Sequence, residues 1–175
     1  MTRLHNWADN HGFAAARLHR PASIADGRRI VAGADPGWPV HLQNEYLLSR
    51  TRTVEAMRLL RGMSQRIDPL LLKTELRSMA ADNSWLSPAR GRDTIGLHFS
   101  WMRDLANVPP LAAEIEALLL PLGARPHWGK IPHTPAASLA PLYPRWDDFR
   151  ALIRRFDPNG KFRNDFLDRH VGDIA

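Results

Sequence analysis

The sequence predicts an α+β fold of the ferredoxin-like type, in which a split β-α-β unit forms an antiparallel sheet with helices on one face. Two observations predict it. Between residues 42 and 128 the hydrophobic patterns follow the order strand, helix, strand, strand, helix, strand. Both helices of this unit carry one apolar stripe, which suits a layer that covers one face of a sheet. The opposite face is then free to hold a site.

The chain divides into two parts by pattern. Residues 1–40 are rich in glycine and proline and have no hydrophobic period. We interpret them as an irregular or disordered N-terminal segment. Folded structure is expected over residues 41–175, with further helices near the C-terminus.

The unit begins with a strand at Leu42–Leu48 and a helix at Thr53–Ile67. The apolar positions of this helix share one face: Ala56, Leu60, Met63 and Ile67. Thr53 is the expected N-cap. The Asp68-Pro69 pair ends the helix, because a residue that precedes proline disfavours the helical conformation.

Two strands follow, at Leu70–Ser78 and Thr94–Trp101, and residues 79–92 form the loop between them. Period-two alternation assigns the side chains of the first strand to two faces. One face is expected to carry Leu70, Leu72, Thr74 and Leu76, and the other Leu71, Lys73, Glu75 and Arg77. In the second strand, four apolar residues alternate strictly with Thr94, Gly96, His98 and Ser100.

A second helix opens at Pro109-Pro110, where proline suits the first turn, and closes before Gly123. Its apolar stripe is Leu111, Ile115, Leu118 and Leu119. A short strand is expected at Arg125–Trp128, followed by a proline-rich extended segment over residues 129–144. The last helix spans Trp146–Phe156, with the stripe Trp146, Phe149, Leu152, Ile153 and Phe156. A terminal turn or helix follows at Phe162–His170.

Composition excludes several classes of function. No cysteine is present, so disulfides, thiolate metal sites and a cysteine nucleophile are excluded. No apolar run approaches the roughly 20 residues of a membrane span, and no signal peptide opens the chain, so we expect a cytoplasmic protein. The net charge of +6 is compatible with nucleic acid, but the basic residues are scattered and carry no nucleic-acid motif. We therefore expect no nucleic-acid partner.

Candidate functional side chains lie on the polar faces of the two strands. The first carries Lys73, Glu75 and Arg77 side by side, although charges that alternate with leucines often face only solvent. The second offers Thr94, His98 and Ser100, and such a row suits an enclosed polar surface better than an open one. A lone histidine is more often a hydrogen-bonded core residue than a catalyst. If the two strands are neighbours, Glu75, Arg77, His98 and Ser100 converge on one sheet face.

The segment Arg125–Lys130 (RPHWGK) adds a lysine to this set. Pro126 and Gly129 predict an unusual local backbone, and Lys130 follows directly. Carboxylate and guanidinium groups suit vicinal hydroxyls, a lysine can stabilise developing negative charge, and histidine can accept a hydroxyl proton near neutral pH. Together these groups fit a polyhydroxylated ligand. Redox chemistry on it would require a cofactor.

Four segments carry a resemblance to a known family: LQNEYLLSR, TELRSMAADNSWLSPARGRDTIGLHFSW, GARPHWGK and DPNGKFRNDFL. Over residues 41–170 the chain resembles the C-terminal half of alditol (xylitol) oxidases, which belong with the D-arabinono-1,4-lactone and L-gulonolactone oxidases among the vanillyl-alcohol-oxidase-type flavoproteins. The resemblance implies an FAD-dependent enzyme whose C-terminal domain binds the substrate. A CH–OH group of a polyol or aldonolactone gives hydride to the flavin, and dioxygen then reoxidises the flavin and yields hydrogen peroxide.

The resemblance also implies roles for five residues. Glu75, Arg77 and Ser100 match the substrate-binding positions, although alditol oxidases more often have threonine where Ser100 stands. Lys130 and His98 match the positions nearest the flavin and the reacting hydroxyl, and either is a candidate for the catalytic base.

No glycine-rich FAD-binding segment and no flavin-linking histidine motif precede Leu42. The main FAD-binding domain is therefore expected to be missing, so that the chain is inactive without a separate FAD-binding domain. The alternative is a non-catalytic, truncated remnant that serves as a ferredoxin-like binding or interaction module.

Overall fold

The computed structural model describes residues 4–5, 12–13, 22–23, 25–26 and 42–172. The chain divides into two units, residues 1–38 and 39–175. In the first unit, β1 (Leu4–His5) and β2 (Gly12–Phe13) pair in antiparallel fashion. Most of residues 1–40 lie outside the described residues, so their irregular character stays a prediction.

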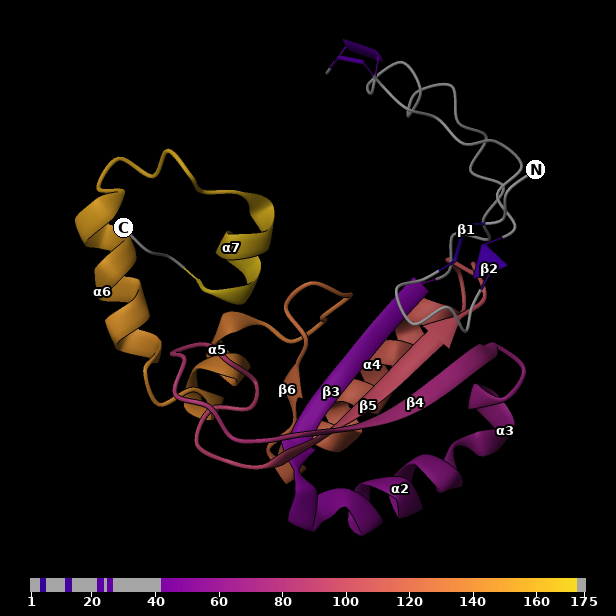
Figure 1. Ribbon diagram of the computed structural model, residues 1–175. Coiled ribbons are helices and arrows are strands. Elements are labelled where there is room, and N and C mark those ends of the chain that lie inside the picture. Colours follow the sequence, from indigo (N-terminus) through magenta and orange to yellow (C-terminus); the bar gives the residue numbers. More distant parts are fainter. Residues whose placement is uncertain (1–3, 6–11, 14–21, 24, 27–41, 173–175) are drawn as a thin grey trace. The chain divides into compact units, whose positions relative to one another are not determined.

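Four antiparallel strands form the sheet of this unit: β3 (Leu42–Ser49), β4 (Leu71–Met79), β5 (Thr94–Trp101) and β6 (Arg125–Pro126). Their order across the sheet is β4-β5-β3-β6 (Figure 1). The first and third strands of the unit are therefore central, and the second and fourth lie at the edges. This is the split β-α-β order, so the predicted α+β, ferredoxin-like fold class is confirmed.

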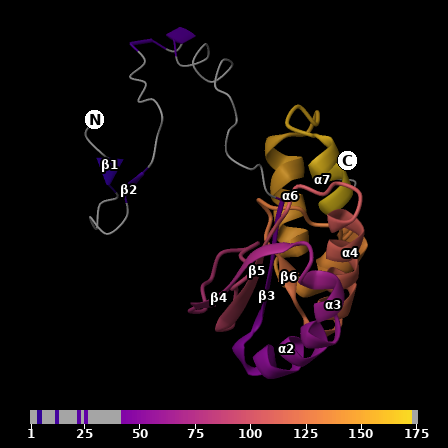
Figure 2. The same cartoon turned by 90° about the vertical axis from the view of Figure 1, so that its right-hand side faces the viewer.

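The helices that connect these strands cover one face of the sheet, as predicted: α2 (Thr53–Gly62), α3 (Ser64–Ile67) and α4 (Val108–Leu119). The edge-on view in Figure 2 shows all three on the same side. Two 3₁₀ turns complete the connections, η1 (Arg50–Arg52) and η2 (Leu120–Leu122). The core between sheet and helices includes Tyr46, Leu48, Leu60, Leu97, Phe99, Trp101, Ile115 and Leu119. Because this layer buries one face only, the other face is left for polar side chains.

The predicted helix at 53–67 is interrupted. It breaks at Met63, whose φ of −102° and ψ of 3° leave the helical region, and continues as α3. The prediction that Thr53 is the N-cap was wrong. Arg52 occupies that position, and the Thr53 hydroxyl instead donates to the carbonyl oxygen of Arg50 at 2.7 Å.

A β-bulge changes which side chains of β4 face the helices. The register with β5 jumps between Leu71 and Lys73. Leu71 consequently packs against the core, whereas Leu72 faces the opposite side, so the predicted faces of these two leucines were wrong. From Lys73 onward the predicted alternation holds, because the single extra residue resets the period only once.

The C-terminal part forms a second, smaller cluster beyond β6 (Figure 1). Its elements are α5 (Ala136–Leu139), η3 (Ala140–Leu142), α6 (Trp146–Phe156) and α7 (Asp165–His170). The fully extended segment predicted at 129–144 was wrong, since α5 and η3 interrupt it. The bounds of α6 were predicted correctly, but Leu152 and Phe156 are 40% and 72% exposed and do not join the buried stripe.

One buried polar chain ties β5, β3 and α4 together. The indole nitrogen of Trp101 donates to Asn44 Oδ1 at 2.8 Å, and Asn44 Nδ2 donates to the Tyr46 hydroxyl at 2.8 Å. The Tyr46 hydroxyl in turn donates to the carbonyl oxygen of Ala112 at 3.1 Å. Among the described residues, no helix is long and apolar enough to cross a membrane.

Candidate active site

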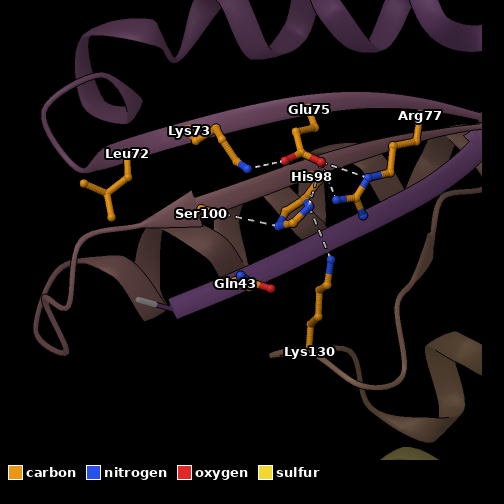
Figure 3. Close-up of a pocket in the computed structure, with 8 residues that line it drawn as sticks. All are labelled: Gln43, Leu72, Lys73, Glu75, Arg77, His98, Ser100 and Lys130. Carbon is orange, nitrogen blue, oxygen red and sulfur yellow. Dashed lines mark hydrogen bonds and ion pairs between the residues drawn. The ribbon is translucent and has the colours of Figure 1, made fainter. Parts of the chain in front are cut away.

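A cavity of about 490 Å³ lies on the sheet face that the helices leave open. It draws side chains from β3, β4, β5 and the segment after β6: Gln43, Leu72, Lys73, Glu75, Arg77, His98, Ser100 and Lys130 (Figure 3). The five side chains that the sequence singled out are all in this set. The structure therefore brings them together, while their chemical roles stay a prediction.

Strand register explains the convergence. In the pairing of β4 with β5, Glu75 lies opposite His98 and Lys73 opposite Ser100. On the other side of β5, His98 faces Glu45 of β3. Since paired residues point to the same face of a sheet, His98 sits on the central strand between two carboxylates.

Lys130 reaches the pocket because its backbone continues along the edge of β3. The formal strand β6 ends at Pro126, short of the predicted Trp128. Nevertheless the His127 amide donates to the Glu45 carbonyl at 2.9 Å, and the Ile131 amide donates to the Gln43 carbonyl at 3.1 Å. Gly129 has no positive φ, and the Lys130 amide donates to the His127 carbonyl at 3.2 Å in a turn that interrupts the extended segment. The two hydrogen bonds to β3 fix the backbone on either side of Lys130 and direct its side chain across the sheet.

The charged side chains form one line of alternating sign. Glu75 pairs with Lys73 and also with Arg77, whose Nε lies 2.9 Å from Glu75 Oε2. Arg77 Nη1 lies 3.3 Å from Glu45 Oε2, and Lys130 Nζ donates to that same oxygen at 2.5 Å. Each carboxylate is thus held between two cations, and the line runs from the exposed rim at Lys73 to the buried floor at Glu45.

These charges shift the pKa values of the carboxylates. Hydrogen bonds from Lys73 and then Arg77 lower the pKa of Glu75 to about 2. Burial alone would raise the pKa of Glu45, but the hydrogen bond and charge of Lys130 and the charge of Arg77 outweigh it and lower that pKa. Both groups are therefore carboxylates at neutral pH and can accept hydrogen bonds.

His98 is held in its neutral form. Burial, followed by the positive charges of Lys130 and Arg77, lowers its pKa from 6.5, against weaker opposing effects of Glu45 and Glu75. Its Nδ1 lies 3.5 Å from Lys130 Nζ, and its Nε2 lies 3.4 Å from Ser100 Oγ. Because an ammonium group only donates, we assign the ring proton to Nε2 and the acceptor role to Nδ1.

Three residues of the site were missed by sequence reasoning. Gln43 and Glu45 alternate with the core-facing Asn44 and Tyr46, and this period of two in LQNEYLL was a usable signal. Leu72 enters the pocket only because of the β-bulge, which no local pattern marks. Among the described residues, no group of three or more His, Cys, Asp or Glu side chains could hold a metal ion.

Comparison with known proteins identifies a family and several relatives. The sequence profile of the D-arabinono-1,4-lactone oxidase family matches residues 40–170. An alditol oxidase from a Streptomyces species is 44% identical over 75% of this chain and 32% of its own length. An L-gulono-1,4-lactone dehydrogenase from Mycobacterium tuberculosis is 35% identical over 73% of the chain and 30% of its own length. The L-gulonolactone oxidase of Bos taurus is 28% identical over 74% of this chain and 30% of its own length. The chain thus spans about a third of the length of these relatives.

Proposed function

Because the chain belongs to the D-arabinono-1,4-lactone oxidase family, we propose that its open sheet face binds the substrate of an FAD-dependent oxidoreductase that acts on a CH–OH group. The proposed substrate is a linear polyol of the xylitol or sorbitol type, with an aldonolactone as the second choice. We infer the preference for a polyol from the alditol oxidase relative, which is the more similar of those described above.

The observation that supports this proposal most is the line of alternating charges in the pocket. A polyol hydroxyl both donates and accepts, so a row of hydroxyls fits a row that alternates carboxylate and cation. Glu75 accepts from one hydroxyl, Arg77 donates to its neighbour, and Ser100 adds a neutral partner. An apolar ligand would leave these groups without compensation for their lost water.

The proposed chemistry begins with removal of a hydroxyl proton. Neutral His98 can accept it at Nδ1, since the pKa of this histidine is lowered and its Nε2 is directed to Ser100. Lys130, which donates to Glu45, is suited to stabilise the negative charge that develops on the substrate oxygen. When bound, FAD supplies the acceptor for the hydride.

The described residues fit only one part of that cofactor. Lys130 and His98 offer polar groups in the pocket, where a flavin edge would meet the substrate. Within residues 42–172, however, no glycine-rich turn leads into a helix N-terminus, which is the usual cradle of a dinucleotide pyrophosphate. We propose that the main FAD contacts come from the two thirds of the relatives' length that this chain does not span.

Dioxygen is the proposed final electron acceptor, with hydrogen peroxide as its product. The relatives include both a named oxidase and a named dehydrogenase, so this choice follows the more similar alditol oxidase. We expect the protein to act in the cytoplasm and without a nucleic-acid partner.

The test combines binding and activity. The purified chain is titrated with xylitol, sorbitol and an aldonolactone, and the His98 ring signals are followed by NMR. FAD and a flavin-bearing domain from a relative are then added, and polyol-dependent hydrogen peroxide is measured. Variants Glu75→Ala and Lys130→Ala should lose binding or activity by about tenfold or more, since each removes a charge-assisted hydrogen bond.

The control is Lys161→Ala, which removes an exposed lysine from the loop between α6 and α7. Unchanged binding and activity in both pocket variants would contradict the site. Binding without any peroxide, even with the flavin domain, would instead favour the non-catalytic binding module.

A further inference from the structure

We propose that Glu45 is a positioning residue, which holds Lys130 and Arg77 in their working places, and that Gly96 is required to give its carboxylate room. This inference rests on the proposed function, because it concerns how the substrate-binding groups of that site are fixed. Glu45 itself does not line the pocket. It lies behind the groups that do, and any effect on the substrate passes through them.

Glu45 contacts two of the three cations in the charge line, Arg77 and Lys130. Its Oε2 accepts from Lys130 Nζ at 2.5 Å, and Arg77 Nη1 lies 3.3 Å from the same oxygen and 3.4 Å from Oε1. The Glu45 side chain is 4% exposed and that of Lys130 is 12% exposed, whereas that of Arg77 is 43% exposed. A buried carboxylate with two cationic partners holds them far more firmly than an exposed pair would.

Glu45 also fixes the backbone that carries Lys130. Its carbonyl oxygen accepts from the His127 amide at 2.9 Å, at the start of the turn that leads to Lys130. The same residue therefore anchors the lysine at both ends, through the backbone upstream and through the ammonium at the tip. In the part of the chain that is described, none of the residues that line the pocket makes both contacts.

Gly96 has a steric role in this arrangement. It lies on β5 opposite Arg77, and its φ is not positive, so the backbone does not require glycine there. A Cβ at this position would lie 2.8 Å from Glu45 Oε1 and 3.0 Å from Met79 Cε. The Glu45 carboxylate would have to shift to make room for a Cβ, and its bonds to Lys130 and Arg77 oppose that shift. The space that the Glu45 side chain occupies therefore explains why glycine suits position 96.

The first test needs neither flavin nor substrate. The chain has three lysines, Lys73, Lys130 and Lys161, so amine acetylation can be followed at each one by peptide mass spectrometry. In Glu45→Gln the ammonium of Lys130 loses its charged partner and can swing into solvent. Its acetylation rate should rise by about tenfold, the size expected for a lost hydrogen bond between charged groups.

Matched variants distinguish the loss of Lys130 positioning from a general loss of folded structure. Lys161 should react at the same rate in every variant. Glu45→Asp should restore part of the protection of Lys130. Gly96→Ala should expose Lys130 although the sequence keeps a glutamate at position 45, because the added methyl group displaces its carboxylate. An unchanged Lys130 rate in both Glu45→Gln and Gly96→Ala, with native circular dichroism, would overturn the proposal. If Glu45→Gln does not fold, Glu45→Asp and Gly96→Ala carry the same test.

The second test uses the pH titration of His98. The charged groups that face this ring are Glu45 on β3, Glu75 and Arg77 on β4, and Lys130. In Glu45→Gln the departing Lys130 removes a positive charge that lowers the pKa of His98 more than the charge of Glu45 raises it. That pKa should therefore rise, as read by NMR, and xylitol binding should weaken. A fall in that pKa, which loss of the Glu45 charge would cause with Lys130 still in place, would contradict the inference. If the unaltered chain binds no polyol, the proposed function fails, while the lysine reactivities still decide whether Glu45 positions Lys130.

Discussion

Replacement of Asn44 by leucine tests whether the buried polar chain beneath the site stabilises the sheet. Asn44 is 2% exposed, and its amide is the acceptor for Trp101 Nε1 and the donor to Tyr46, each at 2.8 Å. Leucine has a similar volume, so little cavity forms. The indole N–H is left buried without an acceptor, which costs about 1–3 kcal/mol. Tyr46 keeps its bond to the Ala112 carbonyl and adds little to the loss.

The assay is urea unfolding of Asn44→Leu, Trp101→Phe and the double variant, with Asn83→Leu as an exposed control. The free energy of unfolding should fall by about 1–3 kcal/mol in Asn44→Leu, and Tm by about 2–4 °C for each kcal/mol. The double variant should lose less than the sum of the two, since neither buried partner is left alone. Strict additivity, or a leucine variant as stable as the parent chain, would refute the reasoning.

Three further predictions concern protonation and the bulge. Burial raises the pKa of Glu116 above 4.5, although hydrogen bonds from the backbones of His133 and Thr134 oppose this rise. The protonated form of Glu116 therefore contributes fully to stability below pH 4.5, and this contribution is lost as pH rises through the folded-state pKa. Urea unfolding should show this loss in the parent chain and not in Glu116→Gln. The pKa of His98 is lowered from 6.5, so stability should fall as pH drops from 6.5 toward the folded-state value, and His98→Gln should flatten that fall. Leu71→Ala should cost about 1 kcal/mol or more, whereas Leu72→Ala should change stability by less than about 0.5 kcal/mol, and equal losses would place the bulge elsewhere.

The sequence predicted best the elements whose pattern is complete within a few residues. The bounds of β5 were correct because Ile95, Leu97, Phe99 and Trp101 alternate without interruption. Those of α6 were correct because acidic residues open the helix and basic residues close it. Since β5 is central, its correct placement was enough to bring His98 and Ser100 beside the charged residues of β4.

Some errors arise where one residue type is compatible with two kinds of local structure. Prolines at 129–144 were interpreted as breakers, but Pro135 immediately precedes α5 and Pro141 lies in the first turn of η3, both positions that tolerate proline. Register and bulges depend on contacts between strands that are distant in sequence, so Leu72 could not be assigned. The period of two in LQNEYLL was enough to assign Glu45 to the polar face, but its partners Arg77 and Lys130 lie far away in the sequence, so its contacts could not be predicted.

The division of the pocket into floor and rim suggests which residues control which property. His98, Ser100 and Glu45 are each about 5% exposed or less, lie on the two central strands, and are fixed by neighbours on both sides. Lys73 and Arg77 lie on the edge strand β4, and their side chains are 63% and 43% exposed. Rigid, buried groups keep the geometry that proton transfer requires, whereas exposed side chains can adjust to ligands of different length. On this argument, substitutions in the floor should act mainly on the proposed chemistry, and substitutions in the rim should change which polyol binds.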